Sequence, residues 1–151
     1  MKTILIATAV LFTSALYLSS QVRASEVNEV AACAGMIIGD AAITYDLDGN
    51  SDSLELALEV AYAGYFGYVF GTMPDQQDIL QADSIMQKNI ELIFTKYENG
   101  AYTNETYEDV IKCYQSNSVQ LIAHGEKIRD NCSTILQFVG NAKTGLMALL
   151  Q

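Results

Sequence analysis

The sequence predicts an all-α protein: a single helical bundle of about five helices with a central antiparallel hairpin. Apolar residues recur three and four positions apart along most of the chain, which is the period of an α-helix. Strands are disfavoured because few stretches alternate polar and apolar residues, and there is only one proline, Pro74. Of the 151 residues, the part after the expected export signal suffices for one domain with its own core and is too short for two.

Residues 1–24 have the features of a cleaved export signal. Lys2 gives a positive start, an apolar run covers residues 4–18, and Val22, Arg23 and Ala24 form a small-x-small cleavage pattern. The run is short for a membrane span, and the acidic residues that follow it are unlike a stop-transfer flank. We therefore expect a signal peptide over residues 1–24, an all-helical domain over residues 25–151, and a periplasmic or secreted protein.

The expected mature chain is strongly acidic. Loss of two basic residues with the signal leaves six basic against eighteen acidic residues, a net charge of −12. Such a charge disfavours binding to nucleic-acid phosphates or anionic lipids. It favours a protein partner with basic patches, although neither the partner nor the oligomeric state follows from the sequence.

The helical period predicts helices in chain order near residues 26–45, 53–72, 76–98, 105–124 and 127–139, with a continuation from 142 left open. The first two are apolar on nearly every side, so they are expected at the centre of the bundle. The third is amphipathic and is expected to be an outer wall. Three arrangements stay open for residues 105–139: one long helix, a hairpin turning at Gly125, or a break at residues 116–118.

Two capping patterns mark the starts of the second and third helices. Asp52 and Glu55 have the spacing of a capping box at the start of the second helix. Thr72 and Asp75 have the same spacing before the third, with Pro74 placed in its first turn. These patterns predict Asp52 and Thr72 as the capping residues.

The two central helices carry small residues four positions apart. Residues four apart share a helix face, so each helix has a ridge without bulky side chains, formed by Ala31, Gly35 and Gly39 in the first and Ala63, Gly67 and Gly71 in the second. Glycine inside a helix costs roughly 1 kcal/mol relative to alanine, which indicates a packing role. We expect the two ridges to meet face to face in a tight hairpin. The same spacing occurs in membrane helix dimers, but Asp40, Glu55 and Glu59 make a membrane hairpin unlikely.

Asp40 is a carboxylate within an otherwise apolar helix. Such a group needs a partner, because burying an unpaired charge is costly. Tyr62, Tyr65 and Tyr68 in the second helix have the spacing to offer it hydroxyl groups. The preferred interpretation is a buried polar anchor that fixes the helix register, and the alternative is a small ligand-binding pocket.

A calcium loop is a weaker hypothesis. Oxygen-bearing side chains alternate at Asp46, Asp48, Asn50 and Asp52. An EF-hand loop also needs a glycine at its sixth position and a glutamate at its twelfth, where this chain has Ser51 and Ala57. An acidic turn before a helix is therefore preferred. His124 is the only histidine, so no other metal centre or cofactor is predicted.

Three cysteines in an exported chain allow one intramolecular disulfide. A bridge between Cys33 and Cys113 is preferred, because it would close a long loop worth on the order of 4 kcal/mol. The alternative joins Cys113 to Cys132 and requires a hairpin near Gly125. In the preferred pairing, Cys132 stays free and is able to form an intermolecular disulfide.

No catalytic motif is present, so the sequence favours a non-catalytic binding or protein-interaction module over an enzyme. Two alternatives are kept. One is a small-ligand carrier with an apolar pocket near Asp40, and the other is a membrane-active protein whose first two helices insert.

Overall fold

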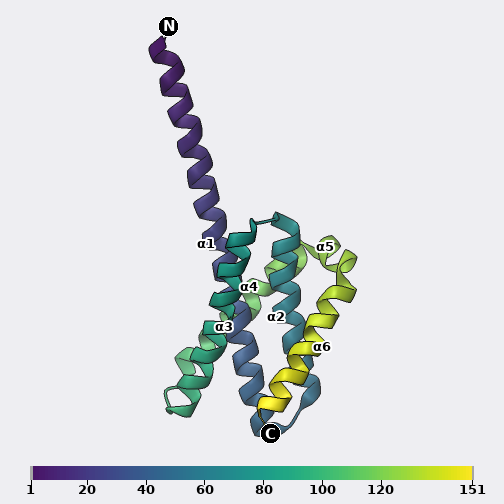
Figure 1. Ribbon diagram of the computed structural model, residues 1–151. Helices are drawn as coiled ribbons and strands as arrows, with labels where there is room; N and C mark the ends of the chain where they lie inside the picture. Colours follow the sequence, from purple (N-terminus) through teal and green to yellow (C-terminus); the bar gives the residue numbers. More distant parts are fainter. Residues whose placement is uncertain (1, 151) are drawn as a thin grey trace.

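The computed structural model describes the backbone of residues 2–150 and the side chains of residues 25–150. Within the described backbone the chain forms helices and no strand, which confirms the all-α class. Successive long helices reverse direction along the bundle (Figure 1). The helices are α1 (Lys2–Asp48), α2 (Ser51–Thr72), α3 (Gln76–Glu98), α4 (Asn104–Ala123), α5 (Gly125–Asp130) and α6 (Cys132–Leu149).

Helix α1 has two parts with different surroundings. Its first part extends away from the bundle, and only its second part lies among the other helices (Figure 1). Val27, near the start of the described side chains, is fully buried. An N-terminal helix outside the bundle is compatible with an export signal, and cleavage before Ser25 stays a prediction.

Helices α1 and α2 run antiparallel at the centre of the bundle (Figure 1). Helix α4 packs against both of them, whereas α3 packs mainly on α1 and α6 on α2. Large side chains from this pair, including Ile37, Leu54, Leu58 and Tyr65, are almost fully buried. Helices α3 and α6 scarcely contact each other, so the side of the central pair between them is incompletely covered.

The predicted face-to-face meeting of the glycine ridges is wrong. A Cβ atom at Gly35 would lie 2.9 Å from Cβ of Asn89, and one at Gly39 would lie 2.8 Å from Cβ of Ile93, both in α3. A Cβ atom at Gly67 would lie 2.7 Å from Cδ1 of Ile128 in α5. The small faces therefore serve close contacts with outer helices, while larger buried side chains fill the centre.

The other members of the two ridges follow the same division. Gly71 lies against His124, at the junction of α4 and α5. Ala31 is fully buried in the main core, and Ala63 is half-buried beside Ile128. Each central helix has several neighbours, so its narrow glycine face can contact an outer helix instead of the other central helix.

Two predicted helix starts are also corrected. Asn50, not Asp52, caps α2: its side-chain oxygen accepts hydrogen bonds from the backbone N–H groups of Asp52 and Ser53, both at 3.1 Å. Asp75, not Thr72, caps α3 by accepting from the N–H of Asp78 at 2.9 Å. Pro74 therefore lies before the cap and outside the first turn. In both cases the residue with extended backbone just before the helix is the one that caps it.

The last third of the chain has two breaks. Helix α4 ends at Ala123, and α5 and α6 are separated by Asn131. His124 and Asn131 have φ values of −119° and −114°, outside the helical range. Of the three arrangements left open for residues 105–139, a hairpin turning at Gly125 agrees best with the end of α4 at Ala123. However, α4 and α6 do not pair with each other as a hairpin would, because both pack on α2.

Candidate functional site

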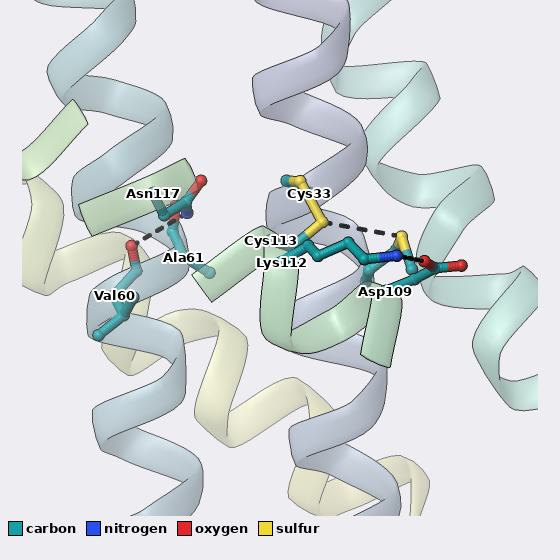
Figure 2. Close-up of a disulfide and its surroundings, with 8 residues drawn as sticks. Cys33, Val60, Ala61, Asp109, Lys112, Cys113 and Asn117 are labelled. Carbon is teal, nitrogen blue, oxygen red and sulfur yellow. Dashed lines mark hydrogen bonds and ion pairs between the residues drawn. A yellow bond between two sulfur atoms is a disulfide. The ribbon is translucent and has the colours of Figure 1, made fainter. Parts of the chain in front are cut away.

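A disulfide joins Cys33 of α1 to Cys113 of α4, as the sequence predicts. Figure 2 shows this bond between the two helices, with Asn117 further along α4 beside α2. The Cα atoms are 4.8 Å apart, and the bond closes a loop across 80 positions of the sequence. Cys132 is free and exposed. The bond fixes α4 on α1 next to Tyr114 and within two turns of Asp40.

The predicted pairing of Asp40 with the tyrosines of α2 is wrong. The hydroxyl of Tyr65 donates to Asp83 at 2.5 Å, and that of Tyr68 donates to Glu26 at 2.9 Å. The reason is the antiparallel register around the turn at residues 49–50, which puts Asp40 level with about residue 59 of α2. Tyr65 and Tyr68 are then roughly 9 Å or more farther along the helix axis.

Asp40 has a different tyrosine as its partner. The hydroxyl of Tyr102, in the segment between α3 and α4, donates to Oδ1 of Asp40. The carboxylate lies at the edge of a pocket of about 260 Å³ between α1, α2 and α4. Its lining residues are Asp40, Ala41, Thr44, Ser53, Ala57, Tyr107, Ile111 and Tyr114. We call this the Asp40 pocket.

The phenols around the Asp40 pocket are held in the neutral form. Burial, followed by the negative charge of Asp40 and the nearby Tyr107, raises the pKa of Tyr114 to about 12. Burial, followed by the hydrogen bond to Asp40 and its charge, also raises the pKa of Tyr102. Among the side chains of residues 25–150, the ion pairs join Lys112 to Asp109, Arg129 to Asp130 and Lys143 to Glu55, so Asp40 has no cationic partner there.

Tyr62, the third tyrosine predicted near Asp40, lines a second and more apolar hollow of about 350 Å³. This hollow lies between α3 and α6, with Ile38 of α1 and Tyr62 of α2 as its floor. Its walls are Gln87, Ile90, Glu91 and Phe94 from α3 and Ala142, Gly145, Leu146 and Leu149 from α6. We call it the α3–α6 groove. Leu149 at its end is 81% exposed, so the groove leaves apolar surface open to solvent.

A row of aromatic rings continues from the floor of the α3–α6 groove. Tyr62, Phe66 and Phe70 stack along α2, with ring centroids 5.9 and 5.7 Å apart. Phe138 of α6 joins them, 4.7 Å from Phe66 between centroids. Burial, and secondarily the charge of Asp83, raises the pKa of Tyr62, so its hydroxyl stays protonated beside the groove.

The contacts around the proposed calcium loop support the acidic-turn interpretation. Asp48 accepts from the backbone N–H of Asn50 at 2.8 Å, and Asn50 is the cap of α2. No cluster of three or more histidine, cysteine or acidic side chains suited to a metal occurs within the described residues. Asp46 and Asp52 are exposed.

Asn117, which was not predicted as a site residue, is a fully buried amide. Its Nδ2 donates to the carbonyl oxygens of Val60 and Ala61 at 3.3 and 3.4 Å (Figure 2). Gly64 makes room for it, since a Cβ atom there would lie 2.7 Å from Cγ of Asn117. A polar residue at an apolar position of α4 was the available signal, and the contact indicates a structural role at the α2–α4 interface.

Within the described residues, the segment Ser25–Asp48 is long and apolar enough to cross a membrane. Its most apolar window is 56% buried inside the protein, as expected for a core helix as well. Comparisons with protein-family models, with curated proteins and with solved structures find no match.

Proposed function

We propose that the protein is an exported, non-catalytic interaction module that binds an amphipathic helix of a partner in the α3–α6 groove. The observation that carries this proposal is the apolar groove between two helices that scarcely contact each other. A third helix laid between α3 and α6 would cover the half-buried Tyr62 and the exposed Leu149 and complete the packing around the central pair. Binding a helix by its apolar face in such a groove is a common recognition mode.

The surroundings of the groove favour a partner helix with a basic polar face. Glu91 on the rim accepts a hydrogen bond from Gln87 at 3.2 Å and is in no ion pair among the described side chains. Lys143, the basic residue of α6, is already paired with Glu55. The expected net charge of −12 for residues 25–151 adds long-range attraction for a basic partner.

Export is supported by two compatible features. The N-terminal helix has the composition of a signal, and a disulfide such as Cys33–Cys113 persists in oxidising compartments. The proposal gives the protein no catalytic role, because the sequence offers no arrangement of nucleophile, base or metal ligands.

Two glycines of α6 provide a matched test. Gly145 lines the α3–α6 groove and Gly140 does not, and at both positions an added Cβ atom meets no atom within 4 Å. Gly145→Trp should fill the groove without unfolding the protein, whereas Gly140→Trp should leave the groove open. Binding of two synthetic amphipathic helices with the same leucine face, one lysine-rich and one glutamate-rich, is measured by calorimetry for residues 25–151.

The expected result is that the lysine-rich peptide binds, and that Gly145→Trp weakens binding at least tenfold while Gly140→Trp does not. Equal binding by both variants, or no binding of the lysine-rich peptide, would refute the groove as an interaction site. Preference for the glutamate-rich peptide would refute the role of the acidic charge.

A small-ligand carrier is a second candidate, favoured by the size of the groove. Its volume of about 350 Å³ lies within the range of small-molecule sites, and the phenol of Tyr62 offers a polar contact. Native mass spectrometry of the protein from its own host would show a retained small molecule in that case. The membrane-active alternative predicts association that resists carbonate washing, and recovery in the soluble fraction would exclude it.

A further inference from the structure

The Asp40 pocket contains a negative charge that the described part of the protein does not neutralise. Asp40 is half-buried, and its hydrogen bond from Tyr102 reaches Oδ1 alone. Oδ2 has no described hydrogen bond, and no lysine, arginine or histidine of residues 25–150 pairs with the carboxylate. The carboxylate is partly withdrawn from water and has no cation beside it, so a positively charged ligand entering the pocket would gain a counter-ion there.

Aromatic rings line the same pocket. Tyr107 and Tyr114 lie seven residues apart on one face of α4 and both border the space beside Asp40. Tyr107 is 51% exposed, so a ligand entering from solvent meets its ring. The face of a tyrosine ring attracts cations, and more strongly where water is partly excluded.

The remaining lining decides which cation fits. Ala41, Ala57 and Ile111 are apolar, and the other two lining residues, Thr44 and Ser53, offer only neutral hydroxyl groups. The hydroxyl of Thr44 already donates to the backbone carbonyl of Asp40 at 3.0 Å, so Asp40 is the only charged oxygen ligand in the lining. Calcium takes six to eight oxygen ligands and magnesium retains much of its water, so neither suits these walls. An organic cation places alkyl groups against the apolar walls and its charge near Asp40. The volume of about 260 Å³ limits it to a small molecule.

We propose that the Asp40 pocket binds a small organic ammonium ion, with Asp40 as the counter-ion and the rings of Tyr107 and Tyr114 as the aromatic wall. The disulfide supports the site, because Cys113 precedes Tyr114 and Cys33 lies two turns before Asp40 on α1. The ammonium group belongs either to a free metabolite or to a lysine side chain of a partner. This site shares no lining residue with the α3–α6 groove, so failure of one proposal would not affect the other.

The test is calorimetric titration of the full chain with the disulfide intact, at constant ionic strength. Choline and n-butylammonium probe the quaternary and primary forms, and 3,3-dimethylbutan-1-ol is the neutral isostere of choline. At least one ammonium ion should bind saturably, and the neutral isostere should bind at least tenfold more weakly than choline. A capped lysine amide is the third ammonium probe. If it alone binds, the natural ligand is a lysine side chain of a partner and not a free small molecule.

Variants locate the binding. Asp40→Asn should weaken it at least tenfold, whereas Asp46→Asn removes the same charge from an exposed position of α1 and should change it less than twofold. Tyr107→Ala keeps the carboxylate and removes an exposed ring, so it should weaken binding several-fold. It tests the site even if the Asp40→Asn protein does not fold. The proposal would be overturned if choline and its isostere bound equally or if no ammonium probe bound. It would also be overturned if Tyr107→Ala, and Asp40→Asn where it folds, both bound the ammonium ion as tightly as the original protein.

Discussion

At the scale of single residues, glycine sets how closely each central helix approaches its outer neighbours. Gly35 and Gly39 of α1 lie against α3, and Gly67 of α2 lies against Ile128 of α5. At Gly35 and Gly39 a side chain has no room, since an added Cβ atom would lie within 3 Å of the backbone of Met86 or of Cβ of Ile93. At Gly67 the nearest atoms are at the end of the Ile128 side chain, which would have to shift. The cost of glycine in a helix is thus offset by close packing.

Gly35→Ala should therefore destabilise the protein, although alanine has the higher helix propensity. The new methyl group would lie 2.9 Å from Cβ of Asn89 and close to the backbone of Met86, so α3 must move outward. We expect a loss of about 1 to 3 kcal/mol in the free energy of unfolding, measured by urea denaturation. Gly140→Ala is the control and should gain up to about 1 kcal/mol, because nothing lies near an added Cβ there. A Gly35→Ala protein at least as stable as the original would contradict the close α1–α3 contact.

Tyr114 gives a prediction about alkaline pH. Its pKa is raised from 10.0 to about 12 in the folded protein, chiefly by burial and then by the charge of Asp40. Below pH 10 the hydroxyl is protonated in both folded and unfolded chains, and between pH 10 and 12 only the unfolded chain readily loses the proton. Stability should fall through this window, by on the order of 1 kcal/mol from this group because the ring is partly solvated.

Urea denaturation at several pH values between 9 and 11.5 measures that loss. Tyr114→Phe cannot ionise, so its stability should fall less steeply with pH than that of the original protein. Identical slopes for the two proteins would show that Tyr114 does not have the raised pKa that its burial near Asp40 implies.

At the scale of elements, the disulfide is the strongest single link between α1 and α4. It joins residues 80 positions apart, so it restricts the unfolded chain more than a short loop would. The double change of Cys33 and Cys113 to serine should lower the free energy of unfolding by about 4 kcal/mol. Cys132→Ser, at the exposed free cysteine, should leave it unchanged. A peptide map without reductant that links Cys113 to Cys132 would contradict the pairing.

Element positions were largely predictable because helical periodicity is a local property of the sequence. The predicted ranges 53–72 and 76–98 are close to Ser51–Thr72 and Gln76–Glu98. The neighbours of each helix were not predictable in the same way. A small face on α1 shows that some helix comes close, and only the packed bundle shows that this helix is α3.

The candidate sites follow the same pattern. Asp40 stood out because a carboxylate interrupts an apolar helix, but its partner Tyr102 lies in an irregular segment without periodicity. The antiparallel register places Tyr65 and Tyr68 too far along α2 to reach it. Tyr107 and Tyr114 carried a usable signal, since they lie seven residues apart on one face of α4. The α3–α6 groove carried no such signal, because it arises from two helices that are far apart in the sequence and scarcely contact each other.

At the scale of the whole molecule, the bundle is covered unevenly. Helix α4 spans both central helices and is tied down by the disulfide and by Asn117. Between α3 and α6 the same central pair is left partly open, with apolar side chains at the surface. The more firmly held side thus supports the Asp40 pocket, and the open side provides the surface proposed for a partner helix.

The boundary of the folded unit gives the last prediction. Among the described side chains, Val27 is the first that is fully buried, and the part of α1 before residue 25 extends outside the bundle (Figure 1). Residues 25–151 alone should therefore have the same free energy of unfolding as the full chain, within about 0.5 kcal/mol. Val27→Asp in the shorter chain should cost about 3 kcal/mol or more, because it buries a charge without a partner. A shorter chain that loses more than about 1 kcal/mol would mean that the leading helix contributes to the fold, which is incompatible with its removal as a signal peptide.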